Sequence, residues 1–316
     1  MPSLNYITVD VFTTSRFSGN PLAVIPDARG LSTSQMQSLA KEFNYSETTF
    51  VLPPQDPSNT AHVRIFTPTS EVPFAGHPNV GTAFVLGQSP ELFGQPVSDT
   101  LRFEEKAGIV EVTLLRNPSS RNVSGATIRA PGPLTTASTI PLELIARCAS
   151  ISTSQIKITS HAPVIASVGL PFAFAELKDL DALQQAKPNL SGFHDANSVY
   201  EKEAAAFPLF LYVRDREDSW SVRARMFAPL DGVAEDPATG SAAAALGALL
   251  VDSNEGDGEK DGVVKVRVEQ GVEMGRRSVI GVEVRKEGGV VRDVFVTGEC
   301  VAVMRGTVED LGELLQ

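Results

Sequence analysis

The stretches that decide the fold occur once in each half of the chain. Arg64–Pro68 reads RIFTP and is followed by HPNVGTA at His77–Ala83, while Arg225–Pro229 reads RMFAP and is followed by DPATGSA at Asp236–Ala242. Asp236 lies 159 positions after His77 (236 minus 77), about half of the 316 residues. This spacing predicts a duplicated domain in which histidine in one copy replaces aspartate in the other.

The length of the chain also favours two domains. A single hydrophobic core is near its practical upper size at 316 residues. The segment Arg116–Pro141 is rich in Pro, Ser, Gly and Thr and has little periodicity. We therefore expect lobes at residues 1–125 and 126–316, with the last residues packing back on the first lobe.

Charge and composition exclude several classes of protein. With 27 basic and 38 acidic residues the net charge is −11, which argues against nucleic-acid or membrane binding but leaves a small anionic substrate open. The start has no secretory signal, and the longest apolar run, Ala242–Val251, is too short to span a bilayer. Cys148 and Cys300 form no metal-binding pattern. We expect a cytoplasmic protein without a structural metal.

The hydrophobic pattern predicts an α+β fold. Branched residues alternate over strand-like segments in both halves, and Leu101–Leu115 reads as a hairpin. From Ser32 or Thr33 the apolar residues recur at helical spacing as far as Asn44, and Ser241–Val251 also reads as a helix.

Each repeated motif is typical of a helix start. Proline is favoured in the first helical turn, and aspartate can cap the turn that it precedes. Uncovered amides at such an end attract a carboxylate. Asp236 and His77 could each be structural, as a cap and as a hydrogen-bonded core histidine, or they could share one ligand or a hydrogen bond. Glu47 is either a solvated glutamate or a partly buried acid with a raised pKa.

Five ordered motifs resemble the phenazine-biosynthesis PhzF-like family. They run through almost the entire chain and are FSGNPLAV at Phe17–Val24, NYSETTFV at Asn44–Val51, PFAGHPNVGTA at Pro73–Ala83, EDPATGSA at Glu235–Ala242 and EQGVEMGRRS at Glu269–Ser278.

The resemblance implies a diaminopimelate-epimerase-like fold with two pseudo-symmetric domains, each a β-barrel-like sheet around a central helix, and an active site in the cleft between them. It also implies a cofactor-free isomerase, usually a homodimer. In family members of the phenazine pathway, trans-2,3-dihydro-3-hydroxyanthranilate is isomerised by moving a proton between ring carbons, which gives a reactive ketone.

The resemblance also assigns catalytic roles. Glu47 in the SET sequence matches the general acid/base of the family. His77 and Asp236 match polar residues that position the substrate and assist proton movement.

Further positions match substrate-binding groups. Ser241, with the amides near Gly240, matches the group that holds the substrate carboxylate, Gly76 lines the pocket through its backbone, and Asn20 matches a residue of the cleft. Arg277 stands where the family often has proline, and this departure puts the identity of the substrate in doubt.

Two other functions stay open. One is an epimerase or racemase of another small acid, using Glu47 with His77 or Asp236. A two-thiol racemase is disfavoured because Cys148 and Cys300 lie outside the motifs. The other is a non-catalytic homologue that binds a metabolite.

Overall fold

The structure is a computed structural model that describes residues 4–253 and 261–309. It divides into two compact units. The first unit comprises Met1–Arg129 and Thr297–Gln316, and the second comprises Ala130–Val296. The predicted surface loop at 252–262 falls mostly on 254–260, which lie outside the described residues, as do 310–316. Up to Val308 the chain returns to the first unit as predicted, because its last strand pairs with Leu4–Val11.

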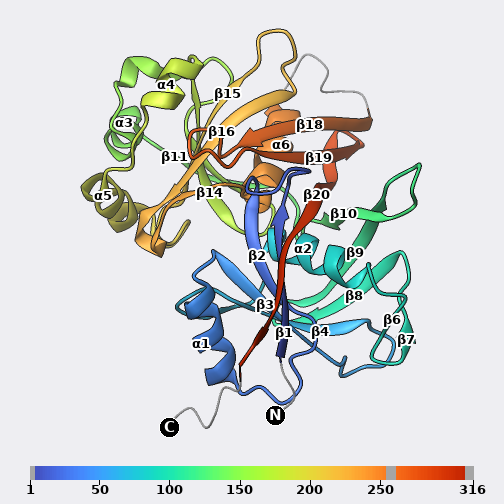
Figure 1. Cartoon of the computed structure of the whole chain (residues 1–316). Coiled ribbons are helices and arrows are strands. Elements are labelled where there is room, and N and C mark those ends of the chain that lie inside the picture. The colour runs from blue at the N-terminus through green and yellow to red at the C-terminus, as the bar shows by residue number, and fades with distance from the viewer. Residues whose placement is uncertain (1–3, 254–260, 310–316) are drawn as a thin grey trace. The chain divides into compact units, whose positions relative to one another are not determined.

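Where it is described, the first unit holds the helices α1 and α2 and a barrel of strands (Figure 1). Its elements are β1 (Leu4–Val11), β2 (Asn20–Ile25), α1 (Thr33–Phe43), β3 (Glu47–Leu52), β4 (Ala61–Phe66), β5 (Glu71–Val72), α2 (Gly76–Leu86), β6 (Glu91–Leu92), β7 (Gln95–Pro96), β8 (Thr100–Glu105), β9 (Gly108–Arg116), β10 (Val123–Arg129) and the end of β20 (Val290–Val308).

Eight of these strands form a closed ring. The pairing runs β1, β2, β3, β4, β8, β9, β10, β20 and back to β1. The pairs β2–β3 and β4–β8 are parallel. Helix α2 lies within this ring and contacts β1, β2, β3, β9 and β10. All residues of α2 are buried, as expected for a helix whose sequence, GHPNVGTAFVL, is apolar on most sides.

Helix α1 covers the outside of the barrel. Its N-cap Ser32 and Gln35 form a capping box, and Asn44 ends it in the left-handed conformation. Its apolar face, with Met36 and Leu39, packs against β2, β3 and β4. The predicted helix is therefore confirmed, and its end leaves the chain three residues from Glu47 at the start of β3.

The second unit contains four α-helices within the described residues. Its elements are β11 (Thr135–Thr139), α3 (Leu142–Ala149), β12 (Ile156–Lys157), β13 (Val164–Ser167), β14 (Pro171–Leu177), α4 (Leu180–Gln185), α5 (Leu190–Tyr200), β15 (Leu209–Arg214), β16 (Ser221–Ala228), β17 (Val233–Asp236), α6 (Gly240–Ser253), β18 (Gly262–Gln270), β19 (Ser278–Glu287) and the beginning of β20.

The strand pairing of the second unit repeats that of the first. It runs β11, β13, β14, β15, β16, β18, β19, β20, and the pairs β14–β15 and β16–β18 are parallel, as their counterparts are. The buried helix α6 contacts β13, β14, β18 and β19 and takes the place of α2. Helices α3, α4 and α5 add a core of their own. The predicted duplication is thus present in the order and direction of the strands.

None of the helices within the described residues is long and apolar enough to cross a membrane.

Candidate functional site

Glu47 and His77 lie together at one end of the first barrel. Glu47 is the first residue of β3, opposite Leu22 of the parallel strand β2. His77 is the second residue of α2. The Nδ1 atom of His77 lies 3.6 Å from Oε2 of Glu47, and the side chains are 6% and 18% exposed. This distance is a close polar contact, longer than an ordinary hydrogen bond.

Local interactions fix the strand and the helix that carry this pair. Thr48 and Thr49, next to Glu47 on β3, are fully buried. The hydroxyl of Thr49 lies 2.8 Å from the hydroxyl of Thr82 on α2, so a hydrogen bond joins the two elements inside the barrel. The position of Glu47 relative to His77 is therefore set by packed secondary structure.

Burial keeps His77 neutral. It lowers the pKa of the imidazole to about 3, and an interaction with the backbone of Pro21 opposes this only in part. At neutral pH the contact with Glu47 is therefore made by an uncharged ring. Such a ring can orient a neighbouring acid, or exchange a hydrogen bond with a ligand, without neutralising the carboxylate.

Asn20 and Gly76 belong to the same end of the first barrel. Asn20 is the fully buried first residue of β2, opposite Val11, and the next residue, Pro21, is the one whose backbone interacts with His77. Gly76 is the buried first residue of α2, and the N-cap Ala75 makes no side-chain hydrogen bond to the helix. The structure thus brings Glu47, His77, Asn20 and Gly76 into one region of the first unit.

Asp236 and Gly240 border the start of α6 in the second unit. Asp236 is buried at the end of β17, and its Oδ2 accepts a hydrogen bond of 2.6 Å from the Thr239 hydroxyl. The amide of Gln270 donates to the Asp236 carbonyl at 2.8 Å and accepts from the Thr239 N–H at 3.1 Å. Gly240 and the partly exposed Ser241 are the first two residues of α6. Gln270 therefore fixes the turn that leads into the helix.

The correspondence of His77 with Asp236, drawn from the two motifs, is wrong. Ile65 and Met226 both follow the arginine of the repeat, and they pair with Val72 and Asp236 respectively. Asp236 therefore corresponds to Val72. Asp236 ends β17 four residues before α6 begins, and its side chain accepts from Thr239 in the turn that it precedes.

The helix starts give the same correction. Helix α2 begins at Gly76 and α6 at Gly240, so His77 and Ser241 are equivalent second residues. The proline of the first motif, Pro78, lies inside α2, whereas that of the second precedes α6. The two motifs are similar in sequence, but their matching residues occupy different positions in the two units. The separate prediction that His77 and Asp236 share one ligand or a hydrogen bond stays a prediction.

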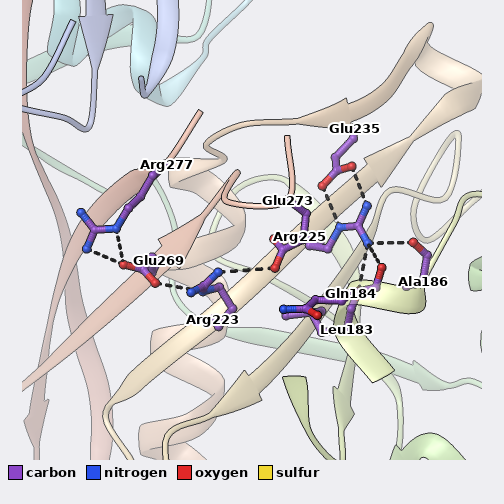
Figure 2. Close-up of polar contacts among 9 residues, drawn as sticks. All are labelled: Leu183, Gln184, Ala186, Arg223, Arg225, Glu235, Glu269, Glu273 and Arg277. Carbon is purple, nitrogen blue, oxygen red and sulfur yellow. Dashed lines mark hydrogen bonds and ion pairs between the residues drawn. The ribbon is translucent and has the colours of Figure 1, made fainter. Parts of the chain in front are cut away.

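Each unit has an arginine–glutamate pair that comparison of the two motifs did not reveal. Arg64 makes two hydrogen bonds of 2.8 Å to Glu71, and its guanidinium lies over the ring of Phe66. In the second unit Arg225 binds Glu235 in the same way (Figure 2). The arginine and the phenylalanine were visible in RIFTP and RMFAP, but the glutamates follow after 7 and 10 residues. Unequal spacing hid them.

Arg225 also ties α4 to the strand before Asp236. Its guanidinium donates to the carbonyls of Leu183 and Ala186 at 2.9 and 2.7 Å, besides Glu235 (Figure 2). Arg225 and these three partners form a frame around β17, the strand that precedes the turn into α6.

The EQGVEMGRRS motif forms a charged network beside this frame. Glu269 binds Arg223 at 2.9 Å and Arg277 at 2.5 Å, and Arg223 also reaches Glu273 at 3.4 Å (Figure 2). Arg277 is thus an exposed ion-pair partner of Glu269 on β18. Gln270 of this motif hydrogen-bonds to the turn before α6.

The two thiols are free and buried. Burial raises the pKa of Cys148 to about 12 and raises that of Cys300 further. Within residues 4–253 and 261–309 there is no cluster of three or more His, Cys, Asp or Glu side chains suited to a metal ion.

Comparison with known proteins identifies the family. The sequence model of the phenazine biosynthesis-like family matches residues 9–306. A trans-2,3-dihydro-3-hydroxyanthranilate isomerase of Pseudomonas chlororaphis is 37% identical over 305 residues, covering 96% of this chain and 99% of the relative.

Solved structures show the same fold. A phenazine biosynthesis protein of the PhzF family from Bacillus anthracis has a TM-score of 0.85 and 26% identity, covering 98% of this chain and 99% of its own. A hydroxyproline epimerase from Agrobacterium vitis shares the fold at a TM-score of 0.63 and 14% identity, with coverages of 98% and 91%.

The barrels and their buried helices define an α+β protein of the diaminopimelate-epimerase-like fold, as predicted. The chain belongs to the phenazine biosynthesis-like, or PhzF, family and is an isomerase.

Proposed function

We propose that the chain moves a proton between two carbons of a small, cyclic, carboxylate-bearing substrate, with Glu47 as the general acid/base. The observation that carries the proposal is the contact between Glu47 and the buried, neutral His77. The substrate class follows the relative that is named as a trans-2,3-dihydro-3-hydroxyanthranilate isomerase.

The proton transfer balances without another reactant. The Glu47 carboxylate takes a proton from one ring carbon, and the electron pair of that C–H bond shifts into the ring. The protonated Glu47 then returns the proton to a second ring carbon, so that substrate and product have the same composition. Positioned acid/base groups of this kind typically contribute about 100- to 10,000-fold in rate.

His77 and the groups of the second unit have supporting roles in this proposal. The neutral imidazole of His77 holds Glu47 and meets a polar group of the substrate. Ser241 and the amides at Gly240 bind the carboxylate, since uncovered N–H groups at a helix start favour an anion. Asp236 meets a polar substituent, and its orientation is fixed by Thr239.

The Glu47→Gln variant tests the proposal, with Glu42→Gln on the exposed face of α1 as the matched control. Glutamine keeps the shape of the side chain but cannot accept the proton. With trans-2,3-dihydro-3-hydroxyanthranilate as the substrate, we expect kcat to fall at least about 100-fold in Glu47→Gln while the Kd stays within about threefold. Wild-type kcat in this variant would overturn the assignment.

A further inference from the structure

Glu105 is a buried acid that the proposed reaction does not use. It ends β8, where burial alternates along the strand: Leu101, Phe103 and Glu105 face the interior of the barrel, while Arg102 and Glu104 face outward. Glu105 is only 9% exposed. A glutamate at an interior position costs free energy unless it is paired or neutral.

The surroundings of Glu105 favour the neutral form. Among the described residues, neither carboxyl oxygen has a hydrogen-bond partner of ordinary geometry. Burial raises the pKa of Glu105 to about 8, and the amide of Asn79 on α2 opposes this only in part.

The charged groups near Glu105 are engaged elsewhere. Those on the flanking strands, on the turn after β8 and on α2 interact as follows: Arg64 and Lys106 with Glu71, Glu111 with Arg102, Arg116 with Asp99, His62 with Glu104, and His77 with Glu47.

The duplicated fold shows which residue stands in the same place in the second unit. On β8, Glu104 lies opposite His62, and on β18, Glu269 lies opposite Arg223. His62 and Arg223 both lie two residues before the arginine of the repeat. The residues that follow on β8 and β18, Glu105 and Gln270, are therefore equivalent.

Gln270 shows what a side chain at this position does. Its amide donates to the Asp236 carbonyl and accepts from the Thr239 N–H, and so holds the turn before α6. Near Glu105 the chain makes a related contact, because the N–H of Ala107 donates to the carbonyl of Pro73, just before α2. A carboxylic acid offers one O–H donor and one C=O acceptor, as an amide offers N–H and C=O, whereas a carboxylate only accepts.

We propose that Glu105, as a neutral carboxylic acid, is a positioning residue that acts through its neighbour Asn79, whose amide donates to the carbonyl of the N-cap Ala75 at 3.0 Å, and so holds the start of α2 with Gly76 and His77. The stability of the protein then depends on protonated Glu105. At alkaline pH the side chain ionises, and the start of α2 is destabilised. The protonation of Glu105 and its effect on stability do not depend on the proposed function. Only the effect of Glu105 on catalysis rests on the proposed function.

Glu105→Gln and Glu105→Ala test the proposal, with Glu111→Gln on the outer face of β9 as the control. Unfolding in urea is measured between pH 5 and pH 9.5, and turnover of trans-2,3-dihydro-3-hydroxyanthranilate is measured over the same range. The first readout needs no substrate, so failure of the reaction assignment, seen in Glu47→Gln, is distinguishable from failure here.

The folding constant of the wild type relative to Glu105→Gln is expected to fall about tenfold per pH unit between 4.5 and 8 and then to level off. Glu105→Gln keeps kcat within about twofold at neutral pH, whereas Glu105→Ala loses stability at every pH. The control follows the wild type. A ratio that does not change with pH, or a more than tenfold loss of kcat in a folded Glu105→Gln variant, would overturn the proposal.

Discussion

Replacement of Glu71 by glutamine should destabilise the protein in a pH-dependent way. Glu71 accepts two hydrogen bonds from Arg64 and lies 2.7 Å from the Lys106 ammonium, and its side chain is 11% exposed. The Arg64 guanidinium is the main cause that lowers the pKa of Glu71 from 4.5 to about 2, with Lys106 assisting and burial opposing. These contacts hold β5 directly before α2.

The size of the effect follows from the two pKa values. A carboxyl whose pKa is depressed on folding adds stability that is fully present above its unfolded pKa of 4.5 and is lost as the pH falls to about 2. The difference of about 2.5 pKa units corresponds to roughly 3 kcal/mol at pH 7, as an upper value because Lys106 is mostly exposed. At pH 3 about 1.4 kcal/mol remains.

Urea unfolding followed by circular dichroism measures this difference. We expect Glu71→Gln to lose about 2–3 kcal/mol at pH 7 and at most about 1.4 kcal/mol at pH 3. The matched control is Glu111→Gln, whose side chain is 60% exposed and pairs with Arg102 on the surface; it should cost about 0.5 kcal/mol or less. An equal loss for Glu71→Gln at both pH values would refute the reasoning, as would a loss no larger than that of the control.

Four further substitutions have outcomes that the same structure predicts. Because the pKa of His77 falls from 6.5 to about 3 on folding, the unfolded chain gains a proton first. In urea titrations the stability of the wild type relative to His77→Gln should therefore drop by roughly 1.4 kcal/mol per pH unit as the pH falls below 6.5. A Cβ at Gly81 would lie 2.6 Å from a methyl of Leu22, so Gly81→Ala should cost about 1–3 kcal/mol. Gly125→Ala should lower the Tm more, because its Cβ would lie 2.0 Å from a backbone oxygen of β20, which cannot turn aside as a side chain can. Ser241→Ala should raise KM about tenfold with little change in kcat if it binds the carboxylate, and an unchanged KM would remove that role.

Local signals in the sequence predicted the elements whose ends are fixed by neighbouring residues. The capping box at Ser32 and the left-handed Asn44 define α1, and both were visible as residue types. The hairpin of β8 and β9 and the buried helix α6 were also predicted, since alternation and a long apolar run do not depend on distant partners.

Contacts between distant segments limited the prediction of the repeat. The correct correspondence of His77 with Ser241 follows from strand pairing and from the start of α2, neither of which the letters of the motifs contain. The first motif was predicted to open a helix, and α2 begins at Gly76, one residue before His77. Glu71 and Glu105 were not predicted as important residues, because their roles also depend on contacts between distant segments.

The structure shows where the predicted site residues lie in each unit. Glu47 and His77 were proposed from motifs 30 residues apart, and the structure brings them into contact. Asp236, Gly240 and Ser241 lie together at the start of α6. The roles of these residues came from resemblance to the family and stay predictions.

Solvent deuterium in the product tests the proton shuttle most directly. Glu47 is partly exposed, so the proton that it holds can exchange with water between the two transfers. In D₂O, with trans-2,3-dihydro-3-hydroxyanthranilate as the substrate, the wild type should form product with deuterium at the carbon that receives the proton, and Glu47→Gln should form neither product nor label. Labelled product at the same rate from both proteins would contradict the account.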